Sequence, residues 1–435
     1  MKRRELLQRT VQGAVGVYVG HGLSLMGQDL PPSEKITMAC IGVGGRGRGN
    51  LNAFLNDPRV RIIAVCDVDR RRAKTAADAV SAFYAKQTKA GVTSPCICTA
   101  DFREIMARPD VDAVMVGTPD HTHALISVSA MRSGKDVYCE KPLAYSVAEG
   151  RLVVQTAETY GRVLQTGTQR RSNGRIRHAC ELVRNGRIGS LKAVRVGLPK
   201  GFQIRNGSHA GNQAEEPVPD WFDYDKWLGP APNAPYTPGR CHFNFRWILD
   251  YGEGYISDWG AHYVDVAHWG MGADTTGPRS VEADAIFPDD GLYDAPTEFH
   301  IEYAYPGDVL LACSTREVLG IKFEGSEGWI HVEKPGVGAV AASDPGLLTS
   351  VIRPNEIHLY ESTSHARNFI DCVVSREATA APPEVGHRSA SACHVGMIAA
   401  RLAKSLTWNA EAEAFVDNPT ADRLLARTPR AGWAL

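Results

Sequence analysis

In the first third of the chain, short apolar runs alternate with longer polar stretches. Residues 36–41, 60–65 and 111–116 are apolar enough to form buried strands. The stretches between them, such as 70–86 and 122–133, have the composition of surface helices. Strands that alternate with helices in this way predict a parallel, doubly wound α/β sheet.

Beyond residue 189 the pattern changes. Short runs of alternating apolar and polar residues are separated by Gly and Pro turns, and few helical stretches intervene, which predicts a second domain with a large, mostly antiparallel sheet. A loop rich in Pro and Trp, 212–246, is too long for a plain connector, and two helices close the chain at 364–374 and 388–405. The predicted strands are 191–196, 280–286, 298–303, 309–314 and 320–323.

Composition excludes several classes of protein. The 435 residues are 43% hydrophobic and 22% charged, which fits a globular chain of two or three domains rather than a disordered one. Lys plus Arg number 48 and Asp plus Glu 49, so the chain lacks the basic excess of a nucleic-acid-binding protein. The ten cysteines are spread thinly along the chain and do not form the pattern of a disulfide framework.

The N-terminus differs from this globular pattern. Arg3 and Arg4 precede an apolar stretch, 11–26, that is too short and too interrupted to span a bilayer stably. A basic flank before a short apolar run is typical of an export signal, and the paired arginines indicate the twin-arginine route to the periplasm. The alternative is a poorly ordered basic tail on a cytoplasmic protein. No later segment is apolar enough to cross a membrane.

A glycine-rich turn follows the first predicted strand, and its six residues fit the pattern G-x-G-x-x-G. Gly42 permits a tight turn, Gly44 lets the backbone approach a pyrophosphate, and Gly47 lets the next helix pack closely. The pyrophosphate would lie at the N-terminus of that helix, where backbone N–H groups favour negative charge. The turn therefore predicts a dinucleotide site that also includes Gly45 and Arg46.

Asp67 ends the next predicted strand and indicates which dinucleotide binds. Its carboxylate would accept hydrogen bonds from the 2′-hydroxyl of the adenosine ribose and repel a 2′-phosphate, which favours NAD over NADP. Three consecutive arginines nearby could accommodate that phosphate, so NADP stays an alternative. They are Arg70, Arg71 and Arg72.

Strand, glycines and acid in this order predict a Rossmann domain at 33–160, after an export signal at 1–32. The remainder, 161–435, is predicted to form an α+β domain with a large open sheet, which binds substrate and supports oligomerisation. Its C-terminal helices are expected to pack back on the Rossmann domain.

Two further motifs follow strands of the first domain. Residues 117–123 read Gly-Thr-Pro-Asp-His-Thr-His, and Glu140-Lys141-Pro142 follows another short apolar run. Together with the glycine-rich turn, they resemble the Gfo/Idh/MocA family (glucose–fructose oxidoreductase, inositol dehydrogenase and rhizopine catabolism proteins). The resemblance covers nearly the whole chain after residue 34, and Glu-Lys-Pro at this position is a specific mark of the family.

The resemblance implies that Lys141 lies beside the nicotinamide and the reacting hydroxyl of a sugar. A dehydrogenase must remove a hydroxyl proton while a hydride leaves, so a partly desolvated lysine suits this place; the alternative is a surface lysine in a loop. Glu140 is expected to position the cofactor or the lysine. The strand-exit residues implied to line the nicotinamide are Thr118, Pro119 and His123.

Asp258, His262 and Asp265 are spaced so that a helix would place all three on one face. The family has an Asp-x-x-x-His pair here, which implies that Asp258 and His262 complete the active site. His262 suits a general base or acid, because an unperturbed imidazole has a pKa of about 6.5. Asp258 would orient it or bind a neighbouring sugar hydroxyl. Two alternatives remain, a divalent metal site and a capped core helix without chemistry, and the resemblance favours a site without metal.

Weaker candidates for substrate contacts are Arg170, which resembles a substrate-contacting arginine of the family, and Arg246, which precedes the Asp-His segment. Each could equally form a structural ion pair. The aromatic residues that could offer ring faces to a sugar, or pack a core instead, are Trp227, Trp247 and Trp259.

The sequence thus predicts an NAD(P)-dependent oxidoreductase that moves a hydride between a hydroxyl-bearing carbon of a sugar or polyol and the nicotinamide. One rival is an NAD-dependent glycosidase that acts by transient oxidation at C3 and elimination. That related group has a similar Gly-Gly-Arg-Gly turn but lacks the lysine, so Lys141 favours simple dehydrogenation. A second rival is a non-catalytic sensor with the same fold. The resemblance also implies a homo-oligomer, a dimer or a tetramer.

The export signal predicts a processed N-terminus. We expect the periplasmic protein to begin between residues 27 and 32, and the double variant Arg3→Lys/Arg4→Lys to stay unprocessed in the cytoplasm, because the twin-arginine route reads the two guanidinium groups. N-terminal sequencing of both cell fractions checks this. An intact Met1 on a cytoplasmic product of the unaltered gene would contradict it.

Overall fold

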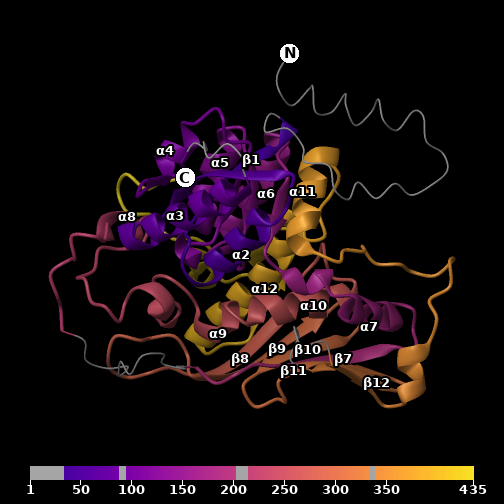
Figure 1. The fold of residues 1–435 in the computed structure, drawn as a ribbon. Helices are drawn as coiled ribbons and strands as arrows, with labels where there is room; N and C mark the ends of the chain where they lie inside the picture. The colour runs from indigo at the N-terminus through magenta and orange to yellow at the C-terminus, as the bar shows by residue number, and fades with distance from the viewer. Residues whose placement is uncertain (1–33, 88–94, 202–213, 334–338) are drawn as a thin grey trace, which may run out of the picture.

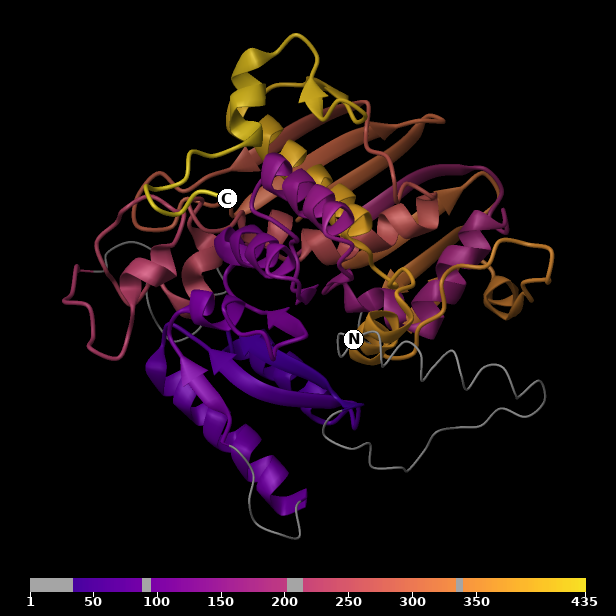
Figure 2. The ribbon, with the colours of Figure 1, turned by 90° about the horizontal axis from the view of Figure 1, so that it is seen from above.

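The computed structural model describes residues 34–87, 95–201, 214–333 and 339–435. The predicted export signal lies outside the described residues. Within them the chain forms a parallel sheet wrapped by helices and a larger open sheet with helices on one face (Figure 1, Figure 2). This arrangement confirms the predicted fold class.

The first domain contains a six-stranded, fully parallel sheet with the order β3-β2-β1-β4-β5-β6. The chain adds β2 and β3 on one side of β1 and β4 to β6 on the other, so the order reverses between β1 and β4. Ligands bind at such a switch point, beyond the carboxyl ends of the strands. The strands are β1 (Ile36–Ile41), β2 (Val60–Cys66), β3 (Ile97–Thr99), β4 (Ala113–Val116), β5 (Asp136–Cys139) and β6 (Leu164–Thr166).

Helices cover both faces of this sheet, which explains why its central strands are apolar on both sides. All residues of β1, β4 and β5 are buried. One face packs on α2 and α3, and the other on α4, α5 and α6. The helices are α2 (Gly45–Leu55), α3 (Arg70–Gln87), α4 (Phe102–Met106), α5 (His123–Arg132) and α6 (Val147–Thr159).

The second domain contains a nine-stranded sheet with the order β13-β12-β11-β7-β10-β9-β8-β14-β15. Every pair is antiparallel except β10 with β7. The strands are β7 (Leu191–Gly197), β8 (Ser280–Ile286), β9 (Glu298–Tyr305), β10 (Val309–Ser314), β11 (Gly320–Gly325), β12 (Trp329–Glu333), β13 (Ala339–Ala342), β14 (Leu406–Asn409) and β15 (Ala414–Phe415).

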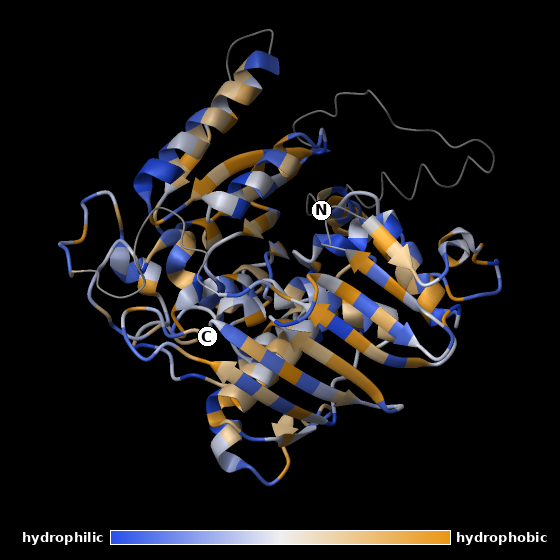
Figure 3. Cartoon of the chain, turned by 90° about the horizontal axis from the view of Figure 1, so that it is seen from below, coloured by the Kyte–Doolittle hydropathy of each residue, from blue (hydrophilic) through white to orange (hydrophobic). Residues whose placement is uncertain are grey.

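Three helices pack on one face of this sheet: α7 (Gly174–Arg184), α10 (Gly260–Met271) and α12 (Pro383–Leu402). Figure 3 views the sheet from its opposite face, with the strands in front and the helices behind them. Side chains of β9 alternate between buried and partly exposed, as expected for a sheet with one covered face.

The two domains share their cores. α12 packs against α6 of the first domain, and α11 (His365–Ser375) packs against α2 (Figure 1). Phe369 of α11 lies edge-on to Phe54 and Tyr138, with ring centroids 6.0 and 5.9 Å apart. The domain boundary expected at residue 160 falls before β6, which the structure joins to the first sheet.

The long loop that begins near residue 212 is built on aromatic side chains. It contains α8 (Tyr224–Leu228) and the 3-10 turn η4 (His242–Trp247), and the ring of Phe222 packs against Trp227 and Tyr236. Backbone hydrogen bonds tie the loop to the first domain, from Arg70 N to Trp221 O and from Asp223 N to Val68 O. The loop therefore lies across the domain boundary, next to the end of β2.

A buried ion pair fixes the segment that follows β6. Arg171, in the 3-10 turn η3 (Gln169–Ser172), donates from Nε to both carboxylate oxygens of Asp265 at 2.9 Å and from Nη2 to Asp274 at 2.7 Å. Arg171 and Asp265 are 2% and 0% exposed.

Replacing Arg171 leaves a buried carboxylate without its partner. We expect Arg171→Met to lower the free energy of unfolding by roughly 3–5 kcal/mol. The control Arg316→Met removes an exposed pair with Asp284 and should change it by less than about 1 kcal/mol. Urea unfolding of both variants measures the difference, and equal stabilities would contradict this account.

Candidate functional site

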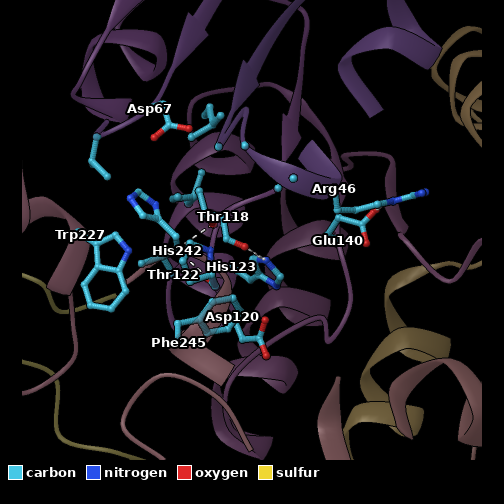
Figure 4. A pocket seen from close by; sticks show the side chains of 18 of the residues that line it. Arg46, Asp67, Thr118, Asp120, Thr122, His123, Glu140, Trp227, His242 and Phe245 are labelled. Atoms are coloured by element: carbon cyan, nitrogen blue, oxygen red, sulfur yellow. Dashed lines mark hydrogen bonds and ion pairs between the residues drawn. The ribbon is translucent and has the colours of Figure 1, made fainter. Parts of the chain in front are cut away.

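A cavity of about 640 Å³ lies between the two domains, at the carboxyl ends of the first domain's strands (Figure 4). The glycine-rich turn, the end of β2 and the segments after β4 and β5 line one side. η4 and the start of α10 line the other. The predicted site residues that reach it are Gly42, Gly44, Gly45, Arg46, Asp67, Thr118, Pro119, His123, Glu140, Lys141, Arg170, Arg246, Asp258 and His262; Gly47 lies beneath the turn.

The glycines of the turn are required by close backbone contacts. Gly42 has a φ of +76°, and a Cβ on Gly47 would lie 1.8 Å from the Gly42 carbonyl oxygen. No side chain caps the N-terminus of α2, so its first N–H groups face the cavity as an anion site.

The charges in the cavity also fit a dinucleotide. Its lining includes six Lys or Arg and four Asp or Glu side chains. The excess of two positive charges matches the two negative charges of a pyrophosphate, as anions are stabilised by such complementary fields. The residues present therefore fit NAD.

Asp67 stands at the end of β2 as predicted. Its carboxylate accepts hydrogen bonds from Val43 N and Asp69 N, both at 2.9 Å, and burial raises its pKa against these bonds. All three neighbouring arginines are engaged elsewhere. Arg70 donates to Asp220 O, and Arg71 pairs with Asp69 and lies over the ring of Trp221. Arg72 Nε lies 3.6 Å from Asp69 Oδ2.

Glu140 holds Arg46 rather than Lys141. Its buried carboxylate accepts hydrogen bonds from Asn50 Nδ2 at 2.7 Å and from Arg46 Nε at 3.1 Å. A Cβ on Gly167 would lie 2.8 Å from the Glu140 carboxyl carbon, so Gly167 packs directly against this carboxylate. Glu140 was expected to position either the cofactor or Lys141. Its contacts with Asn50 and Arg46 match only the first of these roles.

His123 fastens the strand exit to the Glu-Lys-Pro segment. Its Nδ1 lies 2.7 Å from Pro142 O and its Nε2 2.8 Å from Thr118 O, and burial lowers its pKa. Both ring nitrogens thus contact backbone carbonyls, and His123 lines the cavity with its ring carbons while it holds Thr118 in place.

Lys141 and Asp258 meet across the domain boundary. Lys141 Nζ donates to Asp258 Oδ1 and to the Asp258 backbone oxygen, both at 2.6 Å, and Arg246 Nε lies 3.5 Å from the other carboxylate oxygen. Burial alone would raise the pKa of Asp258, but the charges of Lys141 and Arg246 lower it to about 2. Asp258 is therefore a permanent anion that orients the lysine.

His262 lies one turn further, in the first turn of α10. Its Nδ1 is buried with no hydrogen-bond partner among the described residues. Burial lowers the pKa of His262 well below its usual range, and the charges of Lys141, Arg170 and Arg46 act in the same direction. The imidazole is neutral at physiological pH, and His262 lines the cavity.

The structure corrects the expectation for Asp265 and distinguishes between the alternatives for Asp258 and Trp247. Asp258 does not orient His262, because its carboxylate is taken by the two cations. Asp265 does not share the site, since α10 begins only at Gly260 and its turn points Asp265 at Arg171. Trp247 is fully buried in the second domain's core, whereas Trp227 and Trp259 do line the cavity.

Arg170 reaches the cavity without an ion-pair partner among the described residues. Its guanidinium carbon lies 5.3 Å from the ring centre of Tyr263, its Nε is buried and unbonded, and burial lowers its pKa. Such a group is available to a ligand.

Sequence reasoning missed Asp120 and His242. Asp120 follows Pro119 at the strand exit, where the motif gave no reason to single it out, and His242 arrives from the long loop (Figure 4). Only the folded chain brings them to this cavity.

The described residues contain no group of three or more His, Cys, Asp or Glu side chains that could hold a metal ion. Nor do they include a helix with the length and apolarity needed to cross a membrane.

Two sequence models of one oxidoreductase family match the chain. The model of its NAD-binding Rossmann fold matches residues 36–168, and the model of its C-terminal alpha/beta domain matches residues 172–435. The first description names the cofactor, which confirms the prediction of NAD.

Among curated proteins, a "Glycosyl hydrolase family 109 protein" of Saccharopolyspora erythraea is 36% identical over 174 residues, and the match covers 36% of each chain. Among solved structures, GenD2 from gentamicin A biosynthesis in complex with NAD is 21% identical with a TM-score of 0.61, over 89% of this chain and 100% of that one. Levoglucosan dehydrogenase with NADH and levoglucosan is 16% identical with a TM-score of 0.60, over 86% and 99%. The likeness to these structures shows the fold.

The contact beneath the turn yields a prediction. Gly47→Ala places a methyl group against backbone that has nowhere to move, so we expect NAD affinity to fall roughly ten- to hundred-fold. The control Gly49→Ala lies in the same helix with nothing within 4 Å of its Cβ and should bind normally. Fluorescence titration with NADH compares the two, and equal affinities would contradict the account.

Proposed function

Because the chain belongs to the Gfo/Idh/MocA family of oxidoreductases, we propose that it oxidises or reduces a hydroxyl-bearing carbon of a sugar or polyol. NAD, when bound, supplies the acceptor or donor of the hydride. The observation that carries the proposal is the meeting of Lys141, Asp258 and His262 in the cavity that the glycine-rich turn also lines.

Lys141 binds the reacting oxygen. Its ammonium has three N–H groups, and two of them are taken by the oxygens of Asp258. The third is left for the hydroxyl or carbonyl oxygen of the substrate. Since Asp258 keeps its negative charge, the lysine stays anchored while that oxygen changes its own charge.

His262 takes the hydroxyl proton. It is neutral in the free protein because burial and three nearby cations disfavour its charged form. A neutral imidazole accepts a proton when the oxidation of the alcohol makes that proton acidic, and returns it in the reverse reaction. Arg170, which has no ion-pair partner among the described residues, binds a further oxygen of the substrate.

A glycosidase is the second candidate function. It is favoured by the 36% identity to a relative named as a glycosyl hydrolase of family 109, although the chain spans only 36% of that relative's length. Such an enzyme would oxidise and re-reduce the sugar within one turnover. Lys141 favours the dehydrogenase, because the related glycosidase group lacks this lysine.

The two candidates differ in their products. We expect the purified protein, given NAD and a panel of D-glucose, D-xylose, myo-inositol and levoglucosan, to accumulate reduced nicotinamide for at least one sugar. Absorbance of the reduced cofactor measures this. Release of p-nitrophenol from p-nitrophenyl glycosides without net reduction of NAD would overturn the dehydrogenase and establish the glycosidase.

Lys141 provides the test by mutation. We expect Lys141→Met to lower kcat/KM by roughly 10²–10⁴-fold, since the reacting oxygen loses the ammonium group that orients it beside His262. Binding of NADH should persist, because the turn at Gly42 is untouched. The control Lys74→Met removes an exposed lysine paired only with Asp78 and should leave activity unchanged. Full activity of Lys141→Met would contradict the proposed role.

A further inference from the structure

Among the described residues, the carboxyl group of Asp120 in the cavity has no hydrogen-bond donor. Asp120 begins the three-residue turn η2 (Asp120–Thr122) at the exit of β4, and the residue is 5% exposed. No N–H or O–H group of the described residues donates to its carboxylate. The turn itself does not use it either, because Thr122 N bonds to Pro119 O and His123 N to the Asp120 backbone oxygen.

The nearest cations are engaged elsewhere. Lys141 donates two hydrogen bonds to Asp258. Arg246 has its Nε near the Asp258 carboxylate and donates from Nη1 to Phe243 O. On the far side the backbone closes in, since a Cβ on Gly252 would lie 3.4 Å from Asp120 Oδ2. Asp120 lines the cavity, and its carboxyl oxygens are not among the side-chain atoms sealed from solvent without a partner, so a molecule that enters the cavity can reach them.

We propose that Asp120 is a substrate-binding residue, whose carboxylate accepts a hydrogen bond from a sugar hydroxyl next to the carbon that is oxidised. A carboxylate can only accept, so its ligand must carry donors, as neighbouring hydroxyls of a sugar or polyol do. The proposal rests on the proposed function for the identity of the substrate and adds the residue that recognises a second hydroxyl.

Asp120 and Asp258 line the same cavity, but their environments are different. Asp258 stays ionised because Lys141 and Arg246 hold it. Burial raises the pKa of Asp120 to about 7; Lys141 and Arg246 oppose the rise, and Asp258 and Glu253 add to it. Two carboxyl groups whose pKa values are shifted in opposite directions have different roles in one site.

The consequence is a coupling between binding and pH. Below pH about 7 the free Asp120 is a neutral acid, and above it a carboxylate that accepts more hydrogen bonds. Since hydroxyl donors favour the ionised form, substrate binding expels a proton to solvent. Affinity for the sugar therefore rises as the pH increases through this range.

Asp120→Asn removes this titration and keeps the shape of the side chain. We expect kcat/KM above neutral pH to fall roughly ten- to hundred-fold, mainly through KM, and the acid limb of the wild-type profile to disappear. A purely structural role would not remove that limb. The surface control Asp78→Asn should behave as wild type.

Three measurements keep the outcomes separate. Difference infrared spectra of the free protein, between about pH 5 and about pH 9, should lose a protonated carboxyl band with a midpoint near pH 7 in wild type and not in Asp120→Asn. Burial raises the pKa of Asp265 to about 6, so its band should be lost in both proteins. Quenching of bound NADH fluorescence by levoglucosan, myo-inositol, D-xylose and D-glucose gives affinities without turnover. Steady-state kinetics on the same sugars give kcat and KM.

The binding and kinetic results together test the Asp120 proposal and the proposed function separately. Binding that rises with pH and is lost in Asp120→Asn supports Asp120 even if no sugar is oxidised, and then only the proposed function fails. Oxidation with the same KM and the same acid limb in wild type and Asp120→Asn overturns the Asp120 proposal alone. If no sugar binds the wild-type complex with NADH, both fail.

Discussion

The ion pair between Lys141 and Asp258 is the interaction on which the rest of the site depends. The lysine follows β5 of the first domain, and the aspartate precedes α10 of the second. Their contact at 2.6 Å joins the first domain's side of the cavity to the second domain's side, and it sets the charge states around it. Asp258 stays ionised because of this pair, and burial together with the charge of the same lysine keeps His262 neutral.

Much of the fold could be predicted from the sequence, because its elements follow local patterns. β1, β8 and β10 have the bounds that alternation and apolar runs predict, and α3 differs by a single residue. The glycine-rich turn was recognisable because its backbone contacts tolerate no Cβ. Such features depend on neighbours in sequence or on a fixed steric rule, so one sequence reveals them.

The sequence indicated which residues line the cavity better than it indicated which of them contact one another. Resemblance brought Asp258 and His262 forward as partners on one helix. The break between α9 (Gly254–Ser257) and α10 turns Asp258 toward Lys141 instead. Asp120 was not predicted, because no local sequence pattern marks a carboxyl group in a strand-exit loop. It stands out only because the described residues offer its carboxylate no hydrogen-bond donor. Partnerships across 117 residues are set by tertiary packing and cannot be read from spacing.

The helix α11 has a consequence for the order in which the protein can fold. Phe369 and Ile370 belong to the core that β1, α2 and α3 begin. About two hundred residues separate the end of β6 from this helix. While the ribosome synthesises that intervening chain, the Rossmann sheet lacks part of its apolar cover. Phe54 and Tyr138 do not yet have the ring of Phe369 to pack against. The N-terminal half is thus complete only when synthesis nears its end.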